Sequence, residues 1–234
     1  MADDIEPSEC RPPADGIWRV ARALDPLAFR GRLSPDELDN HKAGNRFDSP
    51  DGSYSVLYFA TKLEGCFGET LARFKPDPAL VELVRGDWSD RSFMAPGDVP
   101  ADWRFQRAAA RVSLPAGEDL FLDVESPDTH RVLERQGEIQ YVLASLGLRD
   151  VDVGVVRGGD RRLTRAISRW AWSQNTEADQ RRYAGIRYLS RLNDDWECWA
   201  VFEGTELTKE QQRPISHDMD ELLDVARHYG ITVH

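Results

Sequence analysis

The segment between residues 56 and 74 constrains the fold most strongly, because it joins a buried strand directly to a helix. Val56–Ala60, with the sequence VLYFA, is a short apolar run of β-branched and aromatic residues, which is typical of a buried strand. Apolar residues then recur at helical spacing, at Leu63, Phe67, Leu71 and Phe74. A capping box of Thr61 and Glu64 is predicted to begin this helix, and Lys75-Pro76 ends it.

Glu69 lies on this helix, away from its apolar stripe. At about 100° per residue, the stripe centres about 30° from Leu63 and Glu69 falls at about 240°. Most helix glutamates in such positions are simply solvated. Here, however, Gly65 and Gly68 lie beside Glu69, and an interior glycine costs about 1 kcal/mol relative to alanine. This cost indicates close approach to the backbone, by either a ligand beside Glu69 or a tightly packed second element.

Tyr58 and Arg46 precede the helix and suit a ligand that carries phosphates and rings. A strand tyrosine such as Tyr58 usually belongs to the core, with its hydroxyl hydrogen-bonded. As a functional residue, it would stack on an aromatic ring or hydrogen-bond a ribose. Arg46 follows Gly44-Asn45 and either pairs with Asp48 or Asp51 in a turn, or forks onto a phosphate.

Further cationic and polar candidates lie outside this segment. Arg19, on a predicted strand over 17–21, needs a partner or a solvent-facing side. Ser190 and Arg191 end another predicted strand, where Ser190 points either into a pocket or into the core. Four arginines lie on the helix that follows Asp160: Arg161, Arg162, Arg165 and Arg169. The sequence favours a solvated helix face for them over a role in binding phosphates or an acidic partner.

Strand and helix patterns are mixed along the rest of the chain, which predicts a single α+β domain. Strands are expected over 110–114, 120–124 and 151–156, and a hairpin over 183–191 and 196–203. Helices are expected from Ser126, with a break at Gly137, and over 219–229 up to Gly230, and Asp160 is expected to cap a further helix. Residues 1–15 are expected to form a loose lead-in to a domain over 16–234, and residues 86–104 a long loop.

Composition excludes several classes of function. The net charge is −11, from 30 basic and 41 acidic residues, which argues against direct nucleic-acid binding and against docking on an anionic membrane. Any anionic ligand therefore needs a local cluster of arginines. Three widely spaced cysteines (Cys10, Cys66 and Cys198) indicate a reduced, cytoplasmic compartment without a disulfide framework. The sequence predicts neither a signal peptide nor a membrane span.

Standard cofactor and catalytic motifs are absent. The chain has no GxGxxG, GxxxxGK[ST] or GxSxG pattern, and neither its histidines nor its cysteines have the spacing of metal ligands. We therefore expect no bound metal.

Five short motifs together resemble the RES domain family of bacterial toxins, which is named for arginine, glutamate and serine residues in its pocket. In chain order they are WRV, GNRF, VLYFA, FGETL and GIRYLSR. The resemblance spans residues 17 to 202, is most specific over 44–74, and includes the eleven-residue separation of Tyr58 and Glu69. Two departures are the 86–104 loop and the Leu189-Ser190-Arg191 context, where many members have proline before the serine.

The resemblance implies a fold like that of ADP-ribosyltransferases, with a mixed or antiparallel sheet surrounded by helices. It implies a toxin that consumes NAD by phosphorolysis or hydrolysis, with inorganic phosphate as one acceptor, and that is neutralised by an Xre-like antitoxin. By this resemblance Glu69 is the catalytic carboxylate, Arg46 and Tyr58 act with it and bind NAD, Ser190 is the pocket serine, and Arg19 matches the early arginine. Arg191 is a further candidate for holding phosphate.

Two other functions stay open at this point. One is a transferase that attaches ADP-ribose to a protein, and the other is a non-catalytic interaction module that keeps the fold. The sequence also leaves a homodimer open.

Overall fold

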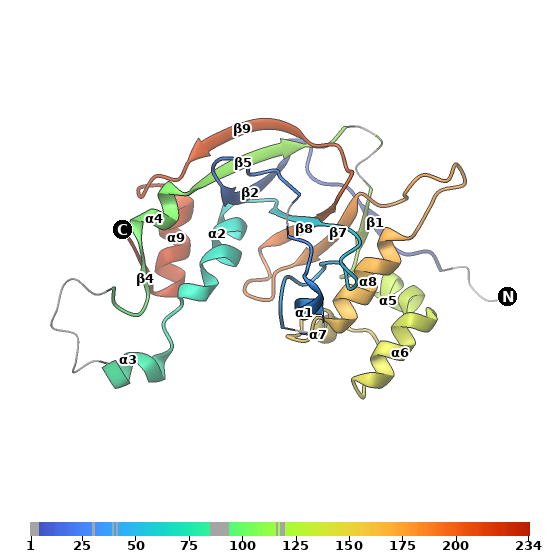
Figure 1. The fold of residues 1–234 in the computed structure, drawn as a ribbon. Coiled ribbons are helices and arrows are strands. Elements are labelled where there is room, and N and C mark those ends of the chain that lie inside the picture. The colour runs from blue at the N-terminus through green and yellow to red at the C-terminus, as the bar shows by residue number, and fades with distance from the viewer. Residues whose placement is uncertain are drawn as a thin grey trace.

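The computed structural model describes residues 5–29, 31–38, 40, 42–84, 94–115, 117 and 120–234. Its main feature is a curled sheet of eight strands (Figure 1). The strands in spatial order are β1 (Glu9–Cys10), β6 (Phe121–Asp123), β7 (Gly185–Leu189), β8 (Glu197–Phe202), β3 (Val56–Ala60), β2 (Ile17–Arg22), β5 (Arg107–Ser113) and β9 (Thr208–Pro214). Only β6 and β7 pair in parallel; the other neighbours are antiparallel. A small parallel sheet joins β4 (Asp98–Val99) to β10 (Thr232–Val233).

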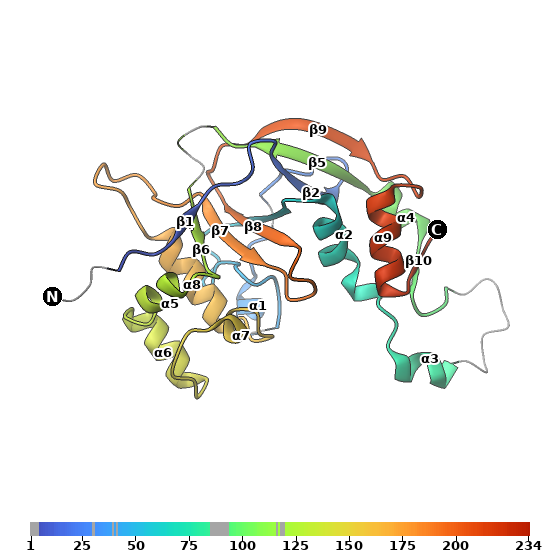
Figure 2. The ribbon, with the colours of Figure 1, turned by 180° about the vertical axis from the view of Figure 1, so that it is seen from behind.

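Helices gather at two places against this sheet (Figures 1 and 2). On one side are α2 (Leu63–Leu71), its 3-10 extension η1 (Ala72–Phe74), α4 (Ala101–Phe105) and α9 (Asp220–Tyr229), with α3 (Pro78–Val84) further out. On the other side are α5 (Pro127–Leu133), α6 (Gly137–Ser145), α7 (Val153–Val156) and α8 (Arg162–Trp172), with the short α1 (Pro35–Leu38) nearby. Helix α2 packs on α9, and α6 packs on α8.

Both faces of the central strands are buried, which explains the continuous apolar run in β3. Val56 and Ala60 join the large cluster beneath the helices, whereas Leu57 and Phe59 join a smaller cluster on the opposite face. Successive side chains of a strand point to opposite faces, so a strand buried on both sides is apolar throughout.

Several predicted elements are confirmed, including the α+β class and a large mixed sheet with surrounding helices. Strand β3 occupies the predicted residues 56–60, and β7 and β8 form the predicted antiparallel hairpin. Ser126 caps α5 by accepting a hydrogen bond from the Asp128 N–H, and Gly137 separates α5 from α6. Gly230 ends α9 in the left-handed region, with φ of 65°.

Two local predictions are wrong. Residues 153–156 form helix α7 rather than a strand, because the Asp152 carboxylate accepts a hydrogen bond from the Val155 N–H (2.7 Å) and caps a turn. The capping box at Thr61 is also wrong. Lys62 is the N-cap of α2, and the Thr61 hydroxyl instead donates to Glu197 on β8 (2.5 Å).

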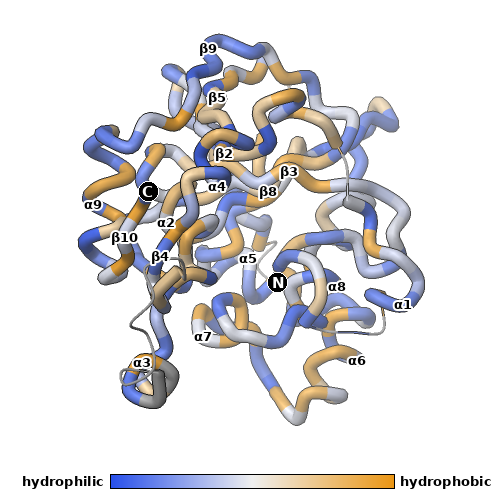
Figure 3. The backbone as a smooth tube through the Cα atoms, turned by 60° about the vertical axis from the view of Figure 1, so that its left-hand side comes forward, coloured by the Kyte–Doolittle hydropathy of each residue, from blue (hydrophilic) through white to orange (hydrophobic). Residues whose placement is uncertain are grey.

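Other differences concern the edges of the domain. The expected loose lead-in contains β1, which pairs with β6. Of the loop predicted over 86–104, residues 86–93 lie outside the described part, while 98–99 and 101–105 form β4 and α4. Strand β9 was not predicted, because its residues are polar and almost all exposed and give no apolar alternation (Figure 3). Asp160 does not occupy the N-cap of α8, which is Arg161, although its carboxylate accepts from the Arg162 N–H (2.9 Å).

Candidate functional site

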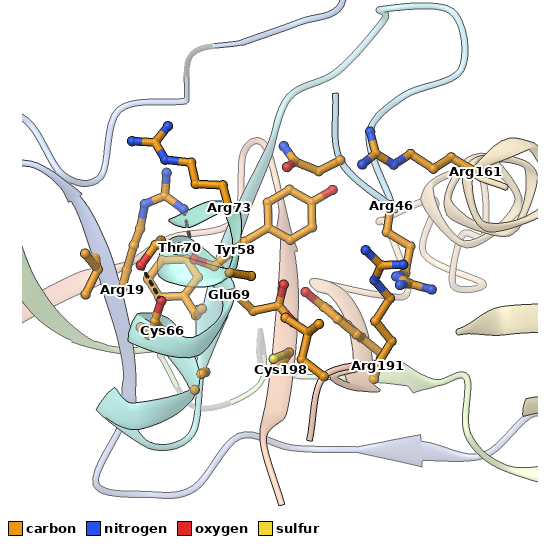
Figure 4. A pocket seen from close by; sticks show the side chains of 18 of the residues that line it. Arg19, Arg46, Tyr58, Cys66, Glu69, Thr70, Arg73, Arg161, Arg191 and Cys198 are labelled. Carbon is orange, nitrogen blue, oxygen red and sulfur yellow. Dashed lines mark hydrogen bonds between the residues drawn. The ribbon is translucent and has the colours of Figure 1, made fainter. Parts of the chain in front are cut away.

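A cleft of about 610 Å³ opens between α2 with η1 on one side and the turn before α8 on the other (Figure 4). Strands β2, β3, β7 and β8 also contribute to its lining through residues such as Tyr58, Tyr188 and Cys198. Clefts of this size hold small molecules and cofactors. The charged residues of the lining are Arg19, Arg46, Glu69, Arg73, Arg161 and Arg191.

Glu69 extends from α2 into this cleft and is held there by Ser190. The Ser190 hydroxyl donates to Glu69 Oε1 at 2.5 Å and accepts from the Leu192 N–H at 3.0 Å. Ser190 itself is fully buried, so it fixes the carboxylate from behind and does not belong to the cleft lining. Glu69, by contrast, is exposed and free to meet a ligand.

Packing on Trp196 requires glycine at position 68, whereas Gly65 packs on Ala60 and also lines the cleft. A Cβ on Gly68 would lie 2.1 Å from Cζ3 and 2.3 Å from Cη2 of Trp196. A Cβ on Gly65 would lie 2.9 Å from Cβ of Ala60. For Gly68, of the two explanations that the sequence left open, the packed second element is therefore the correct one, and that element is the β7–β8 turn carrying Trp196. For Gly65, the structure is consistent with both explanations.

Arg46 reaches across the cleft to the turn before α8. Its Nη1 donates to the carbonyls of Val156 (2.5 Å) and Gly158 (3.2 Å), and no ion pair joins it to the described Asp48 or Asp51. The turn pairing considered from the sequence is therefore wrong. Burial lowers the pKa of Arg46, while the nearby Tyr188 and Glu69 oppose that shift. One edge of the guanidinium is thus anchored, which leaves the rest to face a ligand.

Tyr58 is tied down by a buried carboxylate. Its hydroxyl donates to Asp48 Oδ1 (2.8 Å) and accepts from the Phe47 N–H (3.0 Å), while Asp48 Oδ2 accepts from the Asn45 N–H (2.5 Å). Burial, together with the Asp48 charge, raises the pKa of Tyr58 well above its ordinary value. The phenol is therefore committed to structure, and only the ring of Tyr58 is available to a ligand.

Arg19 is mainly a structural arginine. Its Nε donates to the Pro26 carbonyl (2.8 Å) and its Nη1 to the Tyr58 carbonyl (2.9 Å), so that it joins β2 to β3. Burial lowers its pKa. It still lines the cleft and contributes a fixed positive charge.

The arginines of α8 divide into two kinds. Arg162 and Arg169 form the solvated face expected from the sequence, pairing with Asp160 and Glu138 respectively. Arg161 and Arg165 turn inward instead. Both bind main-chain carbonyls of the 42–44 segment, and Arg161 also lines the cleft.

Sequence reasoning missed two residues of the site. Asp48 was considered only as a partner for Arg46, although it positions Tyr58 and Asn45. Arg73 was not considered at all, although it lines the cleft four residues after Glu69. Since side chains at i and i+4 lie on one helix face, that spacing was the available signal.

Among the residues that the structure describes, no group of three or more His, Cys, Asp or Glu side chains is placed to hold an ion. Within the same residues, no helix has the length and apolarity needed to cross a membrane.

Comparison with known proteins identifies the family. A family model described as RES domain matches residues 17–221. The chain belongs to the RES domain family. The prediction made from the short motifs is therefore confirmed, and the matched range extends past β8 and β9 into α9.

No curated protein matches the chain. Among solved structures, this RES domain is similar to a chain of the crystal structure of the M. tuberculosis MbcT–MbcA toxin–antitoxin complex. The TM-score is 0.41 and the identity 12%, over 95% of this chain and 90% of that chain.

Proposed function

We propose that this RES domain is an NAD-degrading toxin that cleaves the bond between nicotinamide and ribose. The observation that carries the proposal is the Glu69 carboxylate, which enters the cleft from α2 and is held by Ser190 at 2.5 Å. Glu69 is also the one carboxylate among the described residues that line the cleft. A single fixed carboxylate surrounded by arginines suits a substrate that contains phosphates and a sugar that gains positive charge as its bond breaks.

Glu69 would act on the reacting ribose. Loss of nicotinamide builds oxocarbenium character at the anomeric carbon, as in the cleavage of glycosides. A carboxylate fixed in advance stabilises this charge without reorganising during the reaction. The ring of Tyr58, held by the Asp48 hydrogen bond, would orient the nicotinamide end.

The arginines would bind the pyrophosphate. Arg46 is anchored by the carbonyls of Val156 and Gly158, and Arg161 and Arg191 line the same part of the cleft. Guanidinium groups bind phosphate oxygens in a fork, which fits this role. Their concentration in one cleft gives an acidic protein the local positive charge that an anionic ligand requires.

The remaining parts of the proposal follow from the family resemblance. A cytoplasmic toxin acting on NAD needs a neutralising partner, and we propose an Xre-like antitoxin that covers the cleft. Direct binding of nucleic acid is not part of the proposed role, and a homodimer is compatible with it.

Incubation of the purified protein with NAD, with and without phosphate, tests the proposal. Product masses should show free nicotinamide together with ADP-ribose or its 1″-phosphate. Glu69→Gln should lower the rate about a hundred- to a thousandfold, in line with the loss of an electrostatic catalytic group. Glu64→Gln is the matched control, because Glu64 lies on the same helix but outside the cleft lining.

Three results would separate the alternatives. Equal turnover by Glu69→Gln and the unaltered protein would contradict the role of Glu69. Label from NAD appearing on a macromolecule instead of in small products would favour a protein ADP-ribosyltransferase. An intact NAD pool and normal growth on expression would favour a non-catalytic module.

A further inference from the structure

The Glu125 carboxylate lies outside the cleft and joins two segments that hold residues of the site. Glu125 follows β6, and its side chain is 8% exposed. Its Oε1 accepts a hydrogen bond from the Leu189 N–H at 2.9 Å, and its Oε2 accepts from Nη2 of Arg157 at 2.8 Å. Nε of Arg157 contacts both oxygens as well, at 3.3 and 3.1 Å. Neither Glu125 nor Arg157 lines the cleft.

The Leu189 end of this connection leads to Glu69. Leu189 is the last residue of β7, and the next residue, Ser190, donates to Glu69 Oε1 at 2.5 Å. Consecutive residues are joined by a planar peptide, so a shift of the Leu189 N–H moves the Ser190 backbone with it. The Glu125 carboxylate therefore helps to set the position from which Ser190 reaches Glu69.

The Arg157 end of the connection leads to Arg46. Arg157 is the C-cap of α7, and it lies between the two residues whose carbonyls accept from Arg46 Nη1, Val156 (2.5 Å) and Gly158 (3.2 Å). A helix of four residues, such as α7, is too short to be stable by itself, so tertiary contacts must position its end. The forked contact of Arg157 with Glu125 is such a contact.

The second partner of Arg157 differs sharply from the first. Nη1 of Arg157 meets Asp194 Oδ1 at 2.7 Å, but the Asp194 side chain is 83% exposed. An exposed ion pair is screened by water and salt and contributes little. The hydrogen bonds of Arg157 to Glu125 are also the largest cause of its raised pKa, ahead of the contact with Asp194. Glu125 is thus the partner that holds Arg157 in place.

We propose that Glu125, acting through Arg157 and Leu189, is a positioning residue that sets the separation of Arg46 and Glu69. These two groups reach the cleft from different elements, the 45–46 loop and α2 (Figure 4). The inference rests on the proposed function, in which one dinucleotide must place its ribose at Glu69 and its pyrophosphate at Arg46 at the same time. A displacement of about 1 Å in such a site costs up to about a hundredfold in rate.

Two substitutions at Glu125 separate the two ends of the connection. Glu125→Gln keeps an oxygen that can accept from the Leu189 N–H, but it turns an amide donor and no charge toward Arg157. Glu125→Ala removes both contacts. Glu125→Gln preserves the size of the side chain and Val156 stays packed in the core, so this variant should fold even if Glu125→Ala does not.

Calorimetry with ADP-ribose and steady-state kinetics with NAD measure the two effects. We expect Glu125→Gln to weaken ADP-ribose binding about tenfold and to raise the NAD KM about as much, with kcat within about threefold, because only the anchor of Arg46 is disturbed. Glu125→Ala should in addition lower kcat about ten- to a hundredfold, because Ser190 then holds Glu69 from a displaced strand end.

Asp194→Asn is the matched control, because it removes the exposed partner of the same arginine. It should leave ADP-ribose affinity, KM and kcat within about twofold. Arg157→Gln should raise KM as Glu125→Gln does, and the double variant should raise it little further, since both changes break one contact. A purely structural role would instead lower stability in urea and leave KM and kcat of the folded variants unchanged.

The inference is overturned if folded Glu125→Gln binds ADP-ribose and turns over NAD as the unaltered protein does. It is also overturned if Glu125→Gln and Arg157→Gln raise KM independently. Unaltered protein that binds ADP-ribose but releases no nicotinamide from NAD would refute the proposed function instead. The ADP-ribose affinities of Glu125→Gln and Asp194→Asn would then still decide whether Glu125 positions Arg46.

Discussion

Replacing Gly68 by alanine should destabilise the protein, although alanine is the better helix former. The added Cβ would lie 2.1 Å and 2.3 Å from two ring atoms of Trp196, where ordinary contacts are about 3.5–4.0 Å. Trp196 is 7% exposed and its ring meets Tyr229, with centroids 6.0 Å apart. The ring therefore has little room to retreat.

The expected magnitude is a balance of two terms. Overpacking a well-filled core costs about 1–3 kcal/mol, and the very short contact at Gly68 lies at the upper end. Alanine in a helix interior raises the free energy of unfolding by about 1 kcal/mol relative to glycine. We therefore expect a net loss of about 2 kcal/mol, equivalent to a fall in Tm of about 4–8 °C for a chain of this size.

Urea unfolding followed by tryptophan fluorescence and circular dichroism measures this loss. Gly137→Ala is the matched control, because nothing lies within 4 Å of its added Cβ and its stability should be unchanged or slightly higher. In a double-mutant cycle, Trp196→Leu should remove most of the cost of Gly68→Ala. A Gly68→Ala protein of normal stability that has lost NAD turnover would refute this reasoning and return Gly68 to a role in ligand approach.

Three further predictions concern the site and its surroundings. Ser190→Ala should lower kcat for nicotinamide release about ten- to a hundredfold with a smaller change in KM, because Glu69 loses the hydrogen bond that orients it. An unchanged kcat would contradict this role of Ser190. Tyr58→Phe should lower the free energy of unfolding in urea by about 1–3 kcal/mol, since buried Asp48 loses a hydrogen-bond donor. The same change should leave kcat within about threefold, because the ring remains. A large loss of kcat at normal stability would assign the phenol hydroxyl a catalytic role. Burial raises the pKa of Cys66 from 9.0 to about 12, so its contribution to stability is complete below pH 9 and is lost as pH rises through 12. The unfolding free energy should fall by about 1.4 kcal/mol per pH unit in that window on account of this thiol, and Cys66→Ala should reduce that slope.

Elements with a local cause were predictable. The apolar run VLYFA predicts that β3 is buried on both faces. Ser126 predicts the start of α5, and Gly137 predicts the break between α5 and α6. Elements whose cause is distant were not. The Thr61 hydroxyl prefers Glu197 of β8 over the helix N-terminus, and β9 pairs through its backbone with β5 while its side chains stay polar.

The sequence by itself determined the family and the catalytic candidates, because Arg46, Tyr58 and Glu69 lie in one continuous segment whose spacing is fixed by a strand and a helix. Tertiary structure decided what these residues contact. Ser190 reaches Glu69 from 121 positions away, and Arg46 reaches the Val156 carbonyl from 110. Such contacts depend on the packing of separate elements, which leaves no periodic signal in the chain.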